Sequence, residues 1–388
     1  MDHCTLRNKT AITGVGETKY SRASGRSALA LELEAGLKAI TDAGLEPCDI
    51  DGVIPTSSGA AIADDLIANF GMRDLKFSAL VSMGGASCVA GLQVAAAAIA
   101  TGQCQHVLLS LGRNGASGTR AAPRVLGAPH RRVVSEFEAP AGAIAPVQMY
   151  APMARRHMEL FGTTSRQLAE IAVSTRANAA LRDNALMTAP MTIEDHQRSR
   201  MIADPFRLLD CCVESDGGAA VVLSRADYAR TRGGAAVRLL GVAQGHVDSP
   251  SAISQRADMT MLGIAKAAQR AFEMAQVARS DIDVAEIYDC FTYIVLCQLE
   301  DIGFCAKGEG GPFVASGAIR LGGRLPVNTH GGLLSQAHAS GMNHIIELVR
   351  QLRGQAGAAQ VAGARTGIVT GFGDLGAGAI AILQGGAS

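Results

Sequence analysis

The chain has 388 residues, in which lysine plus arginine equal aspartate plus glutamate at 35 each. Hydrophobic residues make up 48% and charged residues 18%, so most of the chain should fold around buried cores, and its length suits two packed domains. The even charge balance excludes the strong basic field that nucleic-acid binding needs.

The cysteines and the N-terminus indicate the cellular compartment and the absence of a zinc site. The first seven residues lack the apolar region of a signal peptide, and no apolar run approaches the roughly 20 residues that span a bilayer. The nine cysteines form neither a Cys-x-x-Cys pair nor a Cys/His cluster at zinc spacing. We therefore expect a cytoplasmic protein with reduced thiols and no bound metal.

Short apolar strands alternate with helices in the first half of the chain. Strands are predicted over residues 11–15, 52–55, 77–81, 106–111 and 219–223, and helices over 27–43 and 89–100. Such β-α-β alternation favours a largely parallel sheet that is covered on both faces.

Between residue 112 and about residue 210 the pattern changes to an insertion. The stretch from Arg113 to Ser135 is rich in Gly, Arg and Pro, and helices follow over 147–180. Long segments that emerge from a strand end often bind ligands, and the arginines here suit a phosphate-bearing small molecule. A solvated cover over the domain is the alternative on residue types alone.

The second half repeats the order of elements of the first. Strands are predicted over residues 237–242, 282–288, 325–328, 367–370 and 379–383, and helices over 262–278, 291–302 and 341–352. This order indicates a duplication. Two similar α/β halves would leave a cleft where their strand ends and helix N-termini meet.

Cys88 has the most reactive setting of the nine cysteines. Small residues precede it and an alanine-rich helix follows, so the thiol lies at or near a helix N-terminus, where the helix dipole favours a thiolate. A thiolate there could attack an acyl carbonyl. The alternative is a small buried hydrophobe that opens a core helix.

Four segments in order carry a family resemblance: residues 85–93, 286–291, 328–341 and 371–378. Together they resemble the thiolase superfamily, and most nearly its sterol-carrier-protein or lipid-transfer-protein branch. The resemblance implies two duplicated βαβαβαββ halves, residues 1–230 and 231–388, in a layered α-β-α-β-α core. Residues 113–205 would form an inserted loop domain that binds coenzyme A.

The resemblance also implies roles for single residues. Cys88 matches the acyl-accepting nucleophile, and His338 matches the histidine that activates it and binds a thioester oxygen. Tyr288 falls in the first oxyanion hole, and Gly373 near the turn that supplies a backbone N–H to the second. His330 is a further candidate for the same cleft. From residue types alone, a packing tyrosine is favoured for Tyr288, and His338 could equally be a solvated or helix-capping histidine.

Ligands and partners follow from the same resemblance. Coenzyme A would be a substrate or product rather than a resident cofactor. The arginines that would meet its phosphates are Arg113, Arg120, Arg155 and Arg156. A homodimer is expected, as is a possible small partner subunit with an OB-fold and a zinc ribbon.

The chain departs from ordinary thiolases at two motifs. Their second catalytic cysteine is missing from residues 371–376, and their Gly-His-Pro motif reads Ala337-His338-Ala339. The altered motifs resemble multi-subunit acyltransferases, aromatic-acyl-CoA thiolases and steroid side-chain aldolases. Those aldolases tend to lack the cysteine and to carry tyrosine at the position of His338.

Because Cys88 and His338 are both present, the sequence favours a thiolase-like acyltransferase that forms a cysteine acyl-enzyme on coenzyme A thioesters. Two alternatives stay open. One is a retro-aldolase that uses Tyr288 and His338 on a 3-hydroxyacyl-CoA, and the other is a non-catalytic carrier of acyl-CoA or lipid.

Overall fold

The structure is a computed structural model that describes residues 6–56, 59–126, 132–231, 236–248, 252–373 and 376–386. Its strands are β1 (Thr10–Glu17), β2 (Gly52–Pro55), β3 (Phe77–Ser78), β4 (His106–Asn114), β5 (Met201–Ala203), β6 (Phe206–Arg207), β7 (Asp216–Arg225), β8 (Val237–Gly245), β9 (Val284–Glu286), β10 (Thr366–Phe372) and β11 (Gly378–Gln384).

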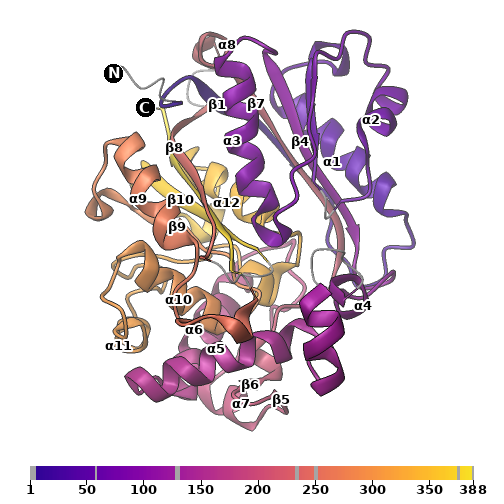
Figure 1. Cartoon of the computed structure of the whole chain (residues 1–388). Coiled ribbons are helices and arrows are strands. Elements are labelled where there is room, and N and C mark those ends of the chain that lie inside the picture. Colours follow the sequence, from indigo (N-terminus) through magenta and orange to yellow (C-terminus); the bar gives the residue numbers. More distant parts are fainter. Residues whose placement is uncertain are drawn as a thin grey trace.

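The helices cover both faces of the main sheet (Figure 1). They are α1 (Ala28–Asp42), α2 (Ala63–Phe70), α3 (Ser87–Ala100), α4 (Ala121–Leu126), α5 (Pro146–Phe161), α6 (Ser165–Ala179), α7 (Ile193–Arg198), α8 (Ala226–Thr231), α9 (Ile264–Ala275), α10 (Thr292–Ile302), α11 (Gly310–Ala315) and α12 (Met342–Leu352). Among the described residues, no helix is both long and apolar enough to cross a membrane.

The strand order of the main sheet shows the duplication directly. Its nine strands run β3-β2-β4-β7-β1-β8-β11-β10-β9. In each half the first strand pairs with the last, β1 with β7 and β8 with β11. The next strand outward is β4 beside β7 in the first half and β10 beside β11 in the second. It is followed by β2 and β9, respectively. The predicted two-half architecture is therefore confirmed.

The expectation of a largely parallel sheet is wrong. Within the main sheet only β2–β3, β2–β4 and β9–β10 run parallel, and the other pairs run antiparallel. The reason is that the last strand of each half returns beside the first in the opposite direction, whereas strands joined through a helical crossover run parallel. The predicted strand over 325–328 is reduced to one bridge between Val327 and Ala285.

Two helices form a middle layer between the halves. Helix α3 packs against β4 and β7 on one side and against β8, β10 and β11 on the other, and α12 likewise contacts strands of both halves. Helix α1 covers the outer face of the first half, and α9 covers that of the second. Alanines fill much of α3, which lets the strands approach it closely on both sides. This arrangement is the predicted α-β-α-β-α core.

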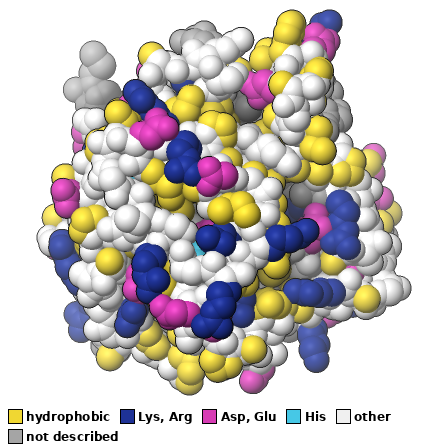
Figure 2. All heavy atoms as spheres, turned by 90° about the horizontal axis from the view of Figure 1, so that it is seen from below, with side chains coloured by type: hydrophobic (Ala, Val, Ile, Leu, Met, Phe, Trp, Pro, Cys, Tyr) yellow, Lys and Arg dark blue, Asp and Glu magenta, His cyan; other side chains and the backbone are white. Residues whose placement is uncertain are grey.

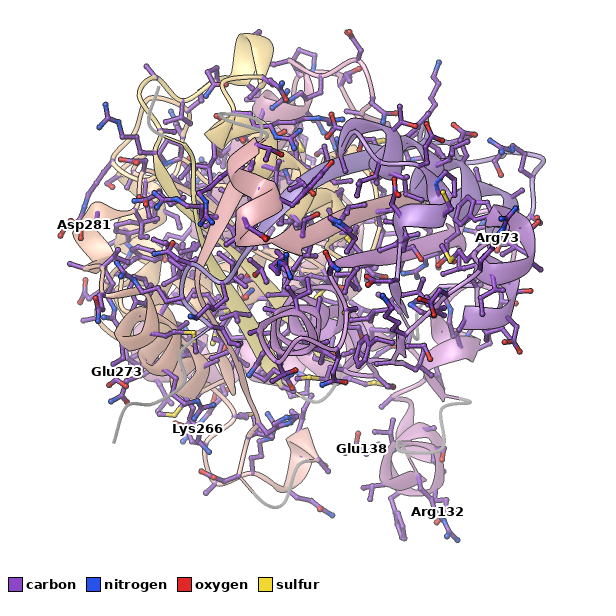
Figure 3. All side chains as sticks on the ribbon, turned by 90° about the horizontal axis from the view of Figure 1, so that it is seen from above. Arg73, Arg132, Glu138, Lys266, Glu273 and Asp281 are labelled. Carbon is purple, nitrogen blue, oxygen red and sulfur yellow. The ribbon has the colours of Figure 1, made fainter. Side chains whose placement is uncertain are left out.

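The insertion forms the lower part of the molecule in Figure 1, where α5, α6, α7 and the β5–β6 hairpin lie together. Basic side chains recur across this lower face among acidic and hydrophobic ones (Figure 2). A segment that carries Arg132 and Glu138 projects from the body (Figure 3). Arg113, in contrast, lies within strand β4 and not in the insertion.

Candidate active site

Tyr288 follows strand β9 and is held through its backbone. Its N–H donates to Thr370 Oγ1 at 2.9 Å, and its carbonyl accepts from Gln298 Nε2 at 2.8 Å. Thr370 Oγ1 in turn donates to Gln298 Oε1 at 2.7 Å, which links the two supports. The side chain is buried, and burial raises the pKa of the phenol well above its ordinary value. Tyr288 is therefore a neutral proton donor at physiological pH.

Two glycines give the Tyr288 ring its space. A Cβ on Gly85 would lie 2.1 Å from the phenol oxygen, and a Cβ on Gly341 would lie 3.0 Å from a ring carbon. Gly85 precedes α3, and Gly341 precedes α12 at a positive φ of 85°. The phenol thus reaches the point where the two helices of the middle layer begin.

His338 lies beside Tyr288 with its ring perpendicular, at 6.3 Å between centroids. Its backbone N–H donates to Ser215 Oγ at 2.7 Å, and its Nδ1 lies 2.8 Å from Arg113 Nη1. Burial and the Arg113 charge hold the pKa of His338 well below its usual range. The imidazole is therefore neutral.

Cys88 is fully buried in the first turn of α3. Burial and the negative charge of Glu32 raise the pKa of its thiol to about 12, although the backbone N–H of Met342 contacts the sulfur and opposes the shift. The hydrogen bonds of His338 to described residues go to Arg113, Ser215 and Ser340, and none reaches Cys88. The structure thus brings His338 to Tyr288 but does not prepare a thiolate.

A buried pair next to Tyr288 was not found from the sequence. His344 Nε2 lies 3.0 Å from Asp289 Oδ1, and the His344 ring is nearly parallel to the Tyr288 ring at 6.2 Å between centroids. Asp289 also accepts from the N–H groups of Leu333, at 2.7 Å, and Leu334, at 3.2 Å. The position of Asp289 directly after Tyr288 was the only available signal for this support.

His330 takes part in a buried polar network rather than facing Tyr288. Its ring lies edge-on to His344 at 4.7 Å, and its Nδ1 is 2.9 Å from Glu286 Oε2. Burial and the neighbouring His344 lower the pKa of His330 to about 3, so this ring too is neutral. Its surroundings make it a structural residue behind the site.

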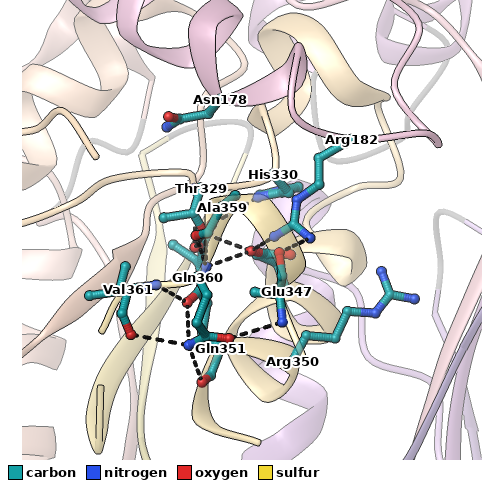
Figure 4. A network of polar contacts seen from close by, with 12 residues as sticks. Asn178, Arg182, Thr329, His330, Glu347, Arg350, Gln351, Ala359, Gln360 and Val361 are labelled. Carbon is teal, nitrogen blue, oxygen red and sulfur yellow. Dashed lines mark hydrogen bonds and ion pairs between the residues drawn. The ribbon is translucent and has the colours of Figure 1, made fainter. Parts of the chain in front are cut away.

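The same network fixes the protonation of Glu286. The Thr329 hydroxyl lies 2.8 Å from Glu286 Oε1 and 2.6 Å from Glu347 Oε1, and it also accepts from Gln351 Nε2 at 2.8 Å. Since a hydroxyl has one proton, it can donate to only one carboxylate, and the other carboxyl group must be protonated. Glu347 is paired with Arg182 (Figure 4). The proton therefore belongs to Glu286, whose pKa burial raises to about 7.

The remaining predicted residues have other partners. The Gly373 N–H donates to Ala377 O at 2.6 Å. The surface arginines Arg120, Arg155 and Arg156 pair with carboxylates, namely Glu214, Asp204 and Glu159. Arg155 lines a surface pocket of about 480 Å³ between α5, the start of α6 and the β5–β6 hairpin. In the described ranges, no group of three or more His, Cys, Asp or Glu side chains could hold a metal ion.

Comparisons with known proteins relate the chain to one family. Residues 245–385 match the family model described as "Thiolase C-terminal domain-like". The chain is 40% identical to a steroid side-chain-cleaving aldolase of Thermomonospora curvata, over 90% of this chain and 91% of that one. It is also 40% identical to the 17-hydroxy-3-oxo-4-pregnene-20-carboxyl-CoA lyase of Mycobacterium tuberculosis, over 90% and 92% of the two chains.

A solved structure is similar over its whole length. This structure, of the "Ltp2-ChsH2(DUF35) aldolase", is 38% identical to this chain, with a TM-score of 0.91 over 98% of each chain. Among these relatives the aldolase and lyase names support the retro-aldolase alternative more than the acyltransferase expectation.

Proposed function

Since this enzyme belongs to the thiolase superfamily, we propose that it is a retro-aldolase that cleaves the C2–C3 bond of a 3-hydroxyacyl-CoA. The observation that carries the proposal is the pairing of two neutral hydrogen-bonding side chains, Tyr288 and His338, at the meeting point of both halves. Such a pair suits proton transfer and oxyanion binding. The names of the relatives support the same reaction class.

In the proposed reaction, the thioester carbonyl oxygen accepts a hydrogen bond from the Nε2–H of His338. The C2–C3 bond breaks, its electron pair moves into the thioester as an enolate, and C3 becomes a ketone. The Tyr288 oxygen takes the proton of the 3-hydroxyl group while the phenol proton passes to C2. The phenol is restored at the end, so the raised pKa of Tyr288 suits this exchange, because a free phenolate is never required.

An acyl-enzyme on Cys88 has less support. The thiol is buried, and burial together with the negative charge of Glu32 raises its pKa to about 12. A nucleophilic cysteine needs a cationic or basic neighbour that lowers this pKa. Cys88 is therefore proposed as a packing residue beside the site.

A partner subunit is part of the proposal. The name of the similar solved structure joins Ltp2 to ChsH2(DUF35), which supports the expectation of a second subunit. We propose that this chain likewise acts with such a subunit on a coenzyme A thioester with a bulky, steroid-like acyl group. The homodimer stays a prediction.

The test supplies the purified chain, alone and with a DUF35 subunit, with 17-hydroxy-3-oxo-4-pregnene-20-carboxyl-CoA and measures release of the ketone and of the shorter acyl-CoA. Cys88→Ala should keep most of the turnover. Tyr288→Phe should lose about 10²- to 10⁴-fold in kcat, the usual contribution of an acid–base group.

Two results would contradict the proposal. Loss of turnover in Cys88→Ala, together with an acyl adduct on the wild-type chain by intact mass, would restore the acyltransferase. Tight binding of the thioester without ketone release in the presence of the partner would indicate a carrier instead.

A further inference from the structure

Arg113 joins the two halves of the molecule at the candidate active site. It lies near the end of β4, and its Nη1 donates to His338 Nδ1 at 2.8 Å and to Ser340 Oγ at 3.1 Å. Its Nε is buried and has no hydrogen-bond partner, and no described carboxylate lies within ion-pair distance of the guanidinium. A half-buried guanidinium without a carboxylate partner loses solvation that nothing replaces, so the position of Arg113 calls for a functional account.

The contact fixes the tautomer of His338. A guanidinium has only donors, so the ring nitrogen that it contacts must present a lone pair. In a neutral imidazole the other nitrogen then carries the hydrogen. Arg113 at Nδ1 therefore leaves Nε2 as the donor of His338.

We propose that Arg113 is a positioning residue that holds His338 as the neutral Nε2–H tautomer and keeps this donor ready for the oxygen of the substrate thioester. This inference rests on the proposed retro-aldol function and deepens it. The positive charge of Arg113 also lies on the Nδ1 side of the imidazole. It therefore stabilises the negatively charged enolate more than the neutral thioester.

The surroundings of His338 agree with this role. The charged or titratable groups that face it are Arg113 from β4, Arg124 from α4, His344 from α12 and Tyr288 after β9. The positive charges of both arginines oppose protonation of the His338 ring.

The experiment observes His338 by NMR of protein labelled with ¹⁵N-histidine, with its signals assigned by subtraction of His338→Gln. The wild-type ring should show the neutral Nε2–H pattern between about pH 5.5 and 7.5, roughly one unit either side of an ordinary histidine pKa. In Arg113→Met the ring should populate both tautomers and accept a proton at higher pH than in the wild type. Arg113→Lys, which keeps a charged donor, should preserve the wild-type pattern.

Kinetics provide the second readout, with Arg225→Met as the matched control, since Arg225 is a surface arginine paired with Asp227 at the end of β7. At pH 8, Arg113→Met should lose at least about tenfold in kcat, less than the roughly 10²–10³ for removal of a direct oxyanion donor. Acidification should restore part of this loss, because an imidazolium again donates from Nε2. The wild type and Arg225→Met should show no such recovery.

An Nδ1–H tautomer in the wild type, or identical His338 titration in Arg113→Met and the wild type, would overturn the inference. If the NMR results are as expected and the wild type releases no ketone, the Arg113–His338 arrangement stands and the retro-aldol function fails. The two proposals are thus tested separately.

Discussion

At the scale of single residues, the position of the Tyr288 phenol depends on the absence of a side chain at Gly85. We predict that Gly85→Ala lowers kcat by roughly 10²-fold with a smaller change in KM, because a misplacement of about 1 Å has an effect of that size. The added Cβ would lie 2.1 Å from the phenol oxygen and would force it to move. Steady-state kinetics on the 3-hydroxyacyl-CoA measure the effect.

Gly36→Ala is the matched control for this substitution. Its Cβ would lie 3.1 Å from the end of the Phe70 ring, in helix α1 and away from Tyr288. This variant should keep the kcat of the wild type. A Gly85→Ala enzyme with wild-type kcat would show that the phenol position is not critical.

The motifs identified Cys88, Tyr288 and His338 as neighbours in one family pattern, but they did not determine which of them interact. Arg113 and His338 are separated by 225 residues in sequence and meet only because both halves fold together. The raised pKa of the Cys88 thiol depends on burial and on Glu32, which comes from helix α1. Neither the burial of Cys88 nor the charge of Glu32 is visible in the sequence next to Cys88. The local sequence therefore favoured a thiolate that the fold does not stabilise.

At the scale of elements, strand β9 ends with a protonated carboxyl group at Glu286. The pKa of Glu286 is raised from its ordinary 4.5 to about 7, so the folded state binds a proton that the unfolded state releases. Its contribution to stability is full below pH 4.5 and is lost as the pH rises through 7. We predict that Glu286→Gln becomes more stable relative to the wild type over this range, by at most about 3 kcal/mol.

Chemical denaturation of both proteins at several pH values checks this difference. His330, whose Nδ1 lies 2.9 Å from Glu286 Oε2, has a pKa lowered to about 3 and is therefore neutral in the folded wild type over this range. The control is Glu194→Gln on the surface helix α7. Its stability relative to the wild type should not increase with rising pH. A constant difference between Glu286→Gln and the wild type would mean that Glu286 is ionised in the folded protein.

Most helices and strands were predictable to within a few residues because their apolar patterns are local. The strand predicted over 325–328 was not, because its residues meet a partner only at Val327. Helix α3 begins at Ser87 rather than at Val89, which places Cys88 inside its first turn. Element ends depend on such contacts between segments, which a local pattern does not contain.

At the scale of the whole molecule, the repeat of elements predicted the duplication but not the direction of the strands. The order of strands and helices is the same in both halves, and this order is visible in the sequence. The second half makes the same antiparallel return, of β11 beside β8, without an insertion, so the direction of β7 beside β1 comes from pairing between distant strands and not from the insertion that precedes β7. The docking of that insertion was likewise not predictable.

The insertion is attached to the second half by a buried ion pair between Arg182, which follows α6, and Glu347 of α12 (Figure 4). Their side chains are 13% and 2% exposed, and Arg182 Nη1 also donates to Ala356 O at 2.8 Å. We predict that Arg182→Met lowers the free energy of unfolding by about 3–5 kcal/mol, because it leaves the Glu347 charge buried and unpaired. The double variant with Glu347→Gln should recover most of this loss.

Denaturant unfolding of the two single variants and the double variant gives the coupling energy of the pair. Arg166→Met serves as the control, since its partner is Glu194 and their side chains are 63% and 55% exposed. That exposed pair should contribute less than about 1 kcal/mol. Additive losses in the Arg182 and Glu347 variants would show that the two charges do not depend on each other, and that other contacts, such as those of Asn178 with Val327 and Asn328, attach the insertion.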